Sequence, residues 1–113
     1  MKVNVEVDTL LNKIVKDLQD VKAKDIQIIN IKNRSALGDY MIIVSGTSSR
    51  HINSIVSNIV KLNKTHILST EGINSTDWLI VDFGDIILNV FKPEIREHYS
   101  LEKIWKNNDL EDE

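Results

Sequence analysis

The stretch DWLIVDFGDIILNVF, residues 77–91, contains two strongly apolar runs that are rich in β-branched residues and separated by Phe83-Gly84. Short apolar runs bounded by turn residues are typical of β-strands, and a glycine between two such runs is typical of a tight hairpin turn. The sequence therefore predicts antiparallel strands over residues 77–82 and 85–91. This hairpin decides the fold class, because it requires a sheet with at least one buried face.

The predicted hairpin has two chemically different faces, because successive side chains of a strand alternate. If Phe83 and Gly84 form the turn, Trp78 lies opposite Asn89. One face is wholly aliphatic and is expected to carry the helices: Leu79, Val81, Ile86, Leu88 and Val90. The other face mixes large apolar groups with polar ones: Trp78, Ile80, Asp82, Asp85, Ile87, Asn89 and Phe91. An apolar patch with polar neighbours and a tryptophan is typical of a protein-binding surface. The alternative is that the last helix or the loop 71–76 covers this face.

Helical periodicity surrounds the hairpin. Asp8 is a suitable N-cap for a helix whose apolar stripe runs from Leu10 to Val21 at three- and four-residue steps. A second stripe, from Ile52 to Val60, follows the turn 46–49, and a last helical region is expected from Pro93 to about Trp105.

Three further strands are expected over residues 25–31, 40–45 and 65–69, with a polar loop at 71–76. The resulting order, α-β-β-α-β-β-β-α, predicts an α/β (α+β) domain with a mixed sheet of about five strands and helices packed on it.

Composition limits the function classes. The chain has 113 residues, 42% hydrophobic and 27% charged, which fits one globular domain over 1–106 and an acidic tail over 107–113. A net charge of −3 argues against a basic nucleic-acid binder, so no DNA partner is expected. Without cysteine, and with three histidines far apart, neither a disulfide nor a metal or other cofactor is expected. No membrane span or signal peptide is apparent, so the expected compartment is the cytoplasm.

An enzymatic alternative rests on residues 46–49, whose hydroxyls and free N–H groups would suit a phosphate. Helix capping by Ser48 or Ser49 explains the same residues without a ligand. Asp82 and Asp85 would suit a divalent cation or a shared proton, although acids at a hairpin tip are usually turn residues. A nucleotide-binding or nucleotidyltransferase-like enzyme therefore stays the alternative to a binding protein, and His51 has no nucleophile beside it that would support catalysis.

Motifs along nearly the whole chain resemble the ribosomal silencing factor family, RsfS or Iojap-like. They occur in order as Asp25-Ile, Asp39-Tyr40, SGTSSR at 45–50, Glu71-Gly72, Trp78 with Asp82-x-Gly-Asp85, Val90-Phe91, and Arg96-Glu-x-Tyr99-x-Leu-Glu-x-x-Trp105. One departure is Asn89, where the family commonly has histidine in a His-Val-Phe triplet. The resemblance implies a nucleotidyltransferase-like fold without the catalytic carboxylates of that superfamily, and so a protein that is not an enzyme.

The resemblance also implies a function. Such a factor binds the large ribosomal subunit through ribosomal protein fourteen, sterically blocks association with the small subunit and represses translation when nutrients are short. Trp78 is the expected central anchor, Ile80, Ile87 and Phe91 extend the patch, and Asn89 and Asp77 supply rim contacts. Arg96, Tyr99 and Leu101 are carried over from the family's C-terminal motif. A homodimer of the free protein, paired through the apolar hairpin face, is a further alternative.

Overall fold

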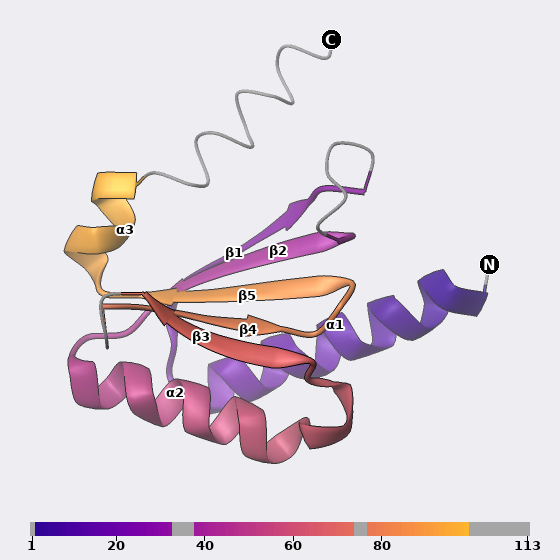
Figure 1. The fold of residues 1–113 in the computed structure, drawn as a ribbon, viewed down its shortest axis with the longest axis horizontal. Helices are drawn as coiled ribbons and strands as arrows, with labels where there is room; N and C mark the ends of the chain where they lie inside the picture. The colour runs from indigo at the N-terminus through magenta and orange to yellow at the C-terminus, as the bar shows by residue number, and fades with distance from the viewer. Residues whose placement is uncertain (1, 33–37, 74–76, 100–113) are drawn as a thin grey trace, which may run out of the picture.

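The computed structural model describes residues 2–32, 38–73 and 77–99 (Figure 1). Its elements follow the predicted order: α1 (Lys2–Asp20), β1 (Lys24–Asn30), β2 (Tyr40–Ser45), α2 (Ser49–Leu62), the 3-10 turn η1 (Lys64–His66), β3 (Ser69–Ile73), β4 (Trp78–Asp82), β5 (Ile86–Phe91) and α3 (Pro93–Tyr99). The acidic tail 107–113 and the expected end of the last helix near Trp105 lie outside the described residues. Within the described ranges, no helix is long and apolar enough to cross a membrane.

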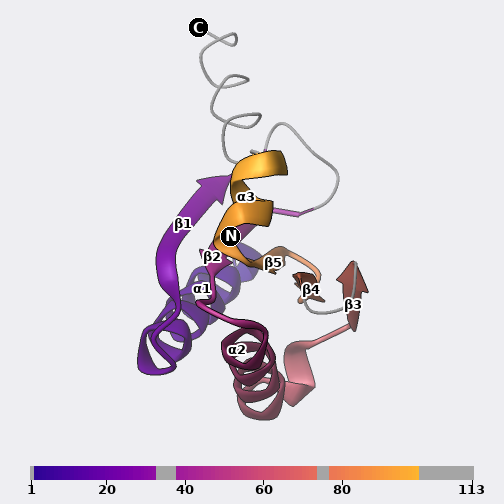
Figure 2. The same cartoon turned by 90° about the vertical axis from the view of Figure 1, so that its left-hand side faces the viewer.

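The five strands form one sheet in the order β1-β2-β5-β4-β3. Strands β2 and β5 are parallel, and the other neighbouring pairs are antiparallel. Helices α1 and α2 cover one face of the sheet, which we call the helix face, and α3 lies on the opposite side, which we call the outer face (Figures 1 and 2). The predicted mixed α/β (α+β) architecture is therefore confirmed.

The main core lies between the helix face and the two long helices. The aliphatic face predicted for the hairpin forms part of it, because Val81, Ile86, Leu88 and Val90 are all completely buried. The same core contains Ile14 of α1 and other members of the predicted helical stripes: Leu18, Ile52, Ile55 and Ile59. Burying these stripes against the sheet is what holds the helices in place.

The hairpin register differs by two residues from the predicted one. Trp78 pairs with Phe91 and Ile80 with Asn89, and the Phe83 N–H donates to the Ile86 carbonyl at 2.9 Å. The tight loop is therefore Gly84-Asp85, with Gly84 at a φ of +92°. Two-residue hairpin turns need a positive φ at their first position, which glycine adopts without strain, and this fixes the register. A shift of two leaves the side chains of the paired strand residues on their predicted faces, whereas Asp85, which was expected on the outer face, becomes a turn residue before β5.

Helix α1 begins at Lys2, not after Asp8 as the capping pattern predicted. Asp8 lies inside the helix, and its carboxylate accepts a hydrogen bond from the Tyr40 hydroxyl at 3.0 Å. The helix ends in a Schellman motif, in which the Ala23 N–H donates to the Leu18 carbonyl at 3.0 Å. Lys22 takes the left-handed position of this motif, with a φ of 61°.

The third strand was predicted too early in the chain. Residues Lys64–His66 form a 3-10 turn, and the strand β3 covers Ser69–Ile73, where a loop was expected. An edge strand pairs on one side only, and Glu71 and Gly72 of this strand are exposed. Such a strand lacks the apolar run by which buried strands are recognised.

Candidate partner-binding surface

The outer face has a covered half and an open half. The covered half lies over β1 and β2, where a second apolar cluster is buried: Ile29, Ile31, Met41, Ile43 and Phe91. Ile95 of α3 packs against this cluster. The alternative that the last helix covers the outer face is therefore right for one half of it. The open half lies over β3, β4 and part of β5, and Met41 of β2 lies at the border between the two halves.

Arg96 fastens α3 to the covered half. Its side chain is only 9% exposed, and Nη1 donates to the hydroxyl of Ser45 at the end of β2 over 2.9 Å. Arg96 was expected to contact a partner, but this geometry gives it a role in holding the helix. The side chain of Tyr99 and all of Leu101, which came from the same motif, lie outside the described residues.

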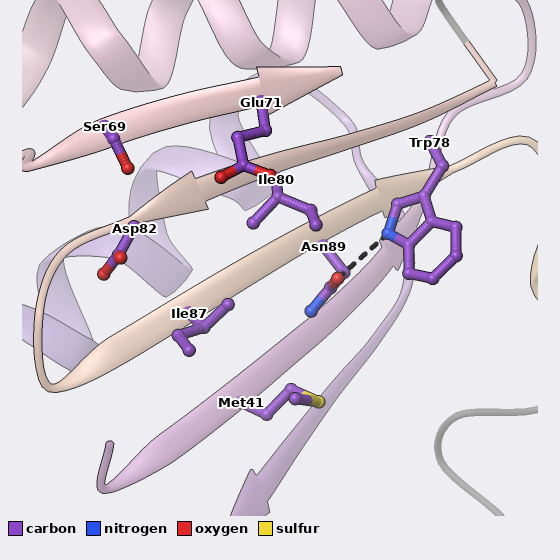
Figure 3. Close-up of a pocket in the computed structure, with 8 residues that line it drawn as sticks. All are labelled: Met41, Ser69, Glu71, Trp78, Ile80, Asp82, Ile87 and Asn89. Atoms are coloured by element: carbon purple, nitrogen blue, oxygen red, sulfur yellow. Dashed lines mark hydrogen bonds between the residues drawn. The ribbon is translucent and has the colours of Figure 1, made fainter. Parts of the chain in front are cut away.

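The open half contains a pocket of about 260 Å³ (Figure 3). Four strands line it, with Met41 from β2, Ser69 and Glu71 from β3, Trp78, Ile80 and Asp82 from β4, and Ile87 and Asn89 from β5. The structure thus brings together four of the residues expected to form a docking patch: Trp78, Ile80, Ile87 and Asn89. The sequence did not indicate Met41, Ser69 or Glu71, because strand order alone determines which strands adjoin the hairpin.

Trp78 is half-buried at one end of this pocket. Its ring stacks on Phe91 with 4.6 Å between ring centroids and an interplanar angle of 26°. Phe91 is only 1% exposed, so the prediction that it extends an exposed patch is wrong. The observed register places Phe91 directly opposite Trp78, so the phenylalanine packs against the indole ring, and the tryptophan is the aromatic group that lines the pocket.

Asn89 lies in the floor of the pocket, 2% exposed, and not at its rim as expected. The indole nitrogen of Trp78 donates to Asn89 Oδ1 at 3.0 Å (Figure 3). Among the residues that the structure describes, Asn89 Nδ2 is a buried side-chain nitrogen without a hydrogen-bond partner. Buried amide groups are nearly always paired, so this nitrogen marks the pocket as incomplete on its own.

Asp77, the other expected rim contact, contacts Lys92 at the end of the hairpin that lies away from the turn. Lys92 Nζ lies 3.1 Å from its carboxylate, and the Lys92 N–H donates to its carbonyl at 3.0 Å. Both side chains are partly exposed, so this ion pair is screened by solvent and contributes little stability. It fixes the main chain immediately before Trp78.

The residues on which the enzymatic alternative rests make structural hydrogen bonds in the folded chain. The Ser48 hydroxyl accepts from the His51 N–H at 3.1 Å and caps α2, as the capping interpretation predicted. The Asp82 carboxylate accepts from the Gly84 N–H at 2.8 Å, which is the turn role expected of it. Over residues 2–32, 38–73 and 77–99, no group of three or more acidic or histidine side chains is arranged to hold a metal ion.

His51 joins the two long helices, a role that its sequence position did not reveal. Nδ1 accepts from the Thr47 N–H at 2.9 Å, so the ring proton sits on Nε2, which donates to the Val21 carbonyl at 3.0 Å. The second contact joins the end of α1 to the start of α2. Both ring nitrogens are therefore engaged with the main chain, and the histidine has a structural part.

Comparison with known proteins shows which family the chain matches. Residues 4–113 match the family model described as "Ribosomal silencing factor during starvation". The chain is 34% identical over 109 residues to a protein of Zymomonas mobilis named Ribosomal silencing factor RsfS, an alignment covering 94% of this chain and 82% of that protein. It is 36% identical to a Mus musculus protein named Mitochondrial assembly of ribosomal large subunit protein 1, covering 91% of this chain and 48% of that protein. A crystal structure of a Chromobacterium violaceum protein superposes with a TM-score of 0.81 at 27% identity, covering 88% of this chain and 85% of that one.

Proposed function

Because the chain belongs to the ribosomal silencing factor family, we propose that it binds the large ribosomal subunit and prevents the small subunit from joining it. The proposed contact is ribosomal protein fourteen of the large subunit, on cytoplasmic ribosomes. The proposed consequence is repression of translation when nutrients are limiting.

The observation that carries this proposal is the pocket of the open half. It combines a half-buried tryptophan, the apolar side chains of Met41, Ile80 and Ile87, and a buried amide nitrogen of Asn89 without a hydrogen-bond partner among the described residues. Large aromatic residues with an apolar surround are the usual anchors of protein interfaces. A partner that fills the pocket removes apolar surface from water and also completes the hydrogen bonding of Asn89.

The charge of the pocket favours a basic partner. Glu71, which is exposed, and Asp82 both line it, and the whole chain has a net charge of −3. Proteins that lie on ribosomal RNA are generally rich in Lys and Arg because they neutralise phosphate groups. An acidic protein therefore gains electrostatic attraction to such a protein while it gains none from the RNA itself.

The proposed mechanism is occlusion, which needs no chemical step. The described part of the chain measures 39 × 32 × 21 Å. In the proposed mechanism, a docked body of this size lies where the small subunit would otherwise make contact. Its effectiveness then depends only on affinity and on the position of the docking site.

The test is a subunit-joining assay. Purified large and small subunits are mixed with Mg²⁺, and their association is followed by light scattering with increasing amounts of the protein. We expect the association amplitude to fall as the protein saturates the large subunit, and an unchanged amplitude at saturation would refute the proposed mechanism. Cross-linking of the bound protein then identifies the neighbour, and the proposal requires ribosomal protein fourteen. Light scattering of the free protein over a concentration series shows whether it forms a homodimer.

A further inference from the structure

We propose that Asn89 selects what enters the pocket, and that its side-chain nitrogen donates a hydrogen bond to a neutral carbonyl oxygen of the bound partner. This inference rests on the proposed function, since it specifies what the partner on the large subunit must present. A carbonyl of the main chain or of an Asn or Gln side chain meets the requirement.

The first step is the orientation of the amide. An indole N–H is a donor and never an acceptor, so the atom of Asn89 that lies 3.0 Å from Trp78 Nε1 must be the oxygen. This contact removes the usual ambiguity between oxygen and nitrogen of an asparagine side chain. In Figure 3 the nitrogen accordingly points away from Trp78 and toward the apolar side chains of the pocket.

The second step is the lack of an internal partner. Asn89 is only 2% exposed, and its Nδ2 has no hydrogen-bond partner within the described parts of the chain. The pocket that Asn89 lines is also lined by Met41, Ile80 and Ile87, whose side chains offer no strong acceptor. The nitrogen therefore has two donor hydrogens available for a group that enters from outside.

The third step is the chemistry of the incoming acceptor. A carboxylate would enter a pocket that Glu71 and Asp82 also line, and like charges repel. A neutral carbonyl has no such penalty, and the apolar lining suits the aliphatic carbon atoms that accompany it. The pocket has about 260 Å³, far more than the roughly 10–15 Å³ that one water molecule needs, so there is room for a piece of the partner.

Two variants separate this donor from the rest of the site. Asn89→Leu has nearly the same size and removes both the donor and the acceptor, whereas Asn89→Asp keeps an oxygen for Trp78 and removes the donor nitrogen. We expect each variant to bind purified large subunits at least about tenfold more weakly than the wild type. The melting temperature of Asn89→Leu should fall less than the loss of binding would suggest, because the variant also removes a buried nitrogen that has no hydrogen-bond partner.

A measurement on the unaltered protein keeps the test independent of any folding defect. The side-chain amide of Asn89 in ¹⁵N-labelled protein is identified by its absence from the Asn89→Leu spectrum or, if that variant does not fold, from the Asn89→Asp spectrum. On addition of isolated large-subunit ribosomal protein fourteen we expect this resonance to move downfield and its hydrogens to exchange more slowly with water.

The outcomes distinguish this inference from the proposed function. If the wild-type protein does not bind large subunits, the proposed function is wrong and this inference falls with it. If the wild type binds, both variants bind as tightly as the wild type, and the amide resonance does not move, the proposed function stands. In that case water satisfies Asn89 and the inference is refuted.

Discussion

Replacing Trp78 by glutamate should abolish docking without unfolding the protein. In the folded chain the indole stacks on Phe91 with 4.6 Å between ring centroids and donates a hydrogen bond to Asn89 at 3.0 Å. An aromatic pair contributes about 0.5–1.5 kcal/mol beyond its buried area. Leaving a buried acceptor unpaired costs about 1–3 kcal/mol. The expected loss of about 1.5–4.5 kcal/mol lies below the 5–15 kcal/mol stability that is usual for a domain.

Trp78→Glu should take away a larger fraction of the binding free energy than of the folding free energy. Anchor residues at the centre of an interface cost about 2–4 kcal/mol on truncation, which corresponds to roughly 30-fold to 1,000-fold weaker binding. Co-sedimentation with purified large subunits measures this affinity, and urea denaturation of each protein measures its stability. Trp78→Phe keeps a ring over Phe91 and loses only the N–H donor, so we expect it to lie between the wild type and Trp78→Glu.

The matched control is Leu68→Glu, which introduces the same charge at an apolar side chain that is 72% exposed and does not line the pocket. It should co-sediment as the wild type does. The reasoning fails if Trp78→Glu is folded and co-sediments at wild-type levels. It also fails if Leu68→Glu loses binding to the same extent, because the loss would then reflect net charge and not the pocket.

Three predictions concern the scaffold. Lys22→Gly should raise stability by about 0.5–1 kcal/mol in urea denaturation, because Lys22 holds a φ of 61° that glycine adopts freely; unchanged or lower stability would contradict the assigned Schellman motif. Gly38→Ala should cost about 1–3 kcal/mol, since the new Cβ would lie 2.9 Å from the Asp85 carbonyl oxygen; a stability equal to wild type would show that the two loops do not meet. Arg96→Met should cost about 1–3 kcal/mol by leaving the Ser45 hydroxyl unpaired, and amide exchange should rise in Pro93–Tyr99; unaltered exchange there would exclude the anchoring role.

The parts of the fold that the sequence predicts well depend on periodicity. The aliphatic face of the hairpin survives an error of two residues in the turn, because alternation is unchanged by an even shift. The stripes of α1 and α2 are equally robust, since their three- and four-residue spacing is seen only in a helix with one buried side. The start of α1 was missed because Asp8 suits a cap and also suits its actual partner, the Tyr40 hydroxyl.

The candidate site was less predictable, because it depends on contacts between distant segments. The hairpin alone places Trp78, Ile80, Ile87 and Asn89 on one face, and the pocket confirms that they lie together. The burial of Phe91 and Arg96 depends on where α3 packs, which no local pattern indicates. Glu71 joined the pocket only because β3 lies beside β4, a pairing that sequence spacing does not determine.

A cryo-electron microscopy structure of the protein on the large ribosomal subunit tests the central claim most directly. The account predicts that the open half of the outer face meets the ribosome, with Trp78 enclosed by a ribosomal protein and the helix face of the sheet still covered by α1 and α2. A complex in which Trp78 and Asn89 face solvent, with α1 and α2 making the contact, would contradict it.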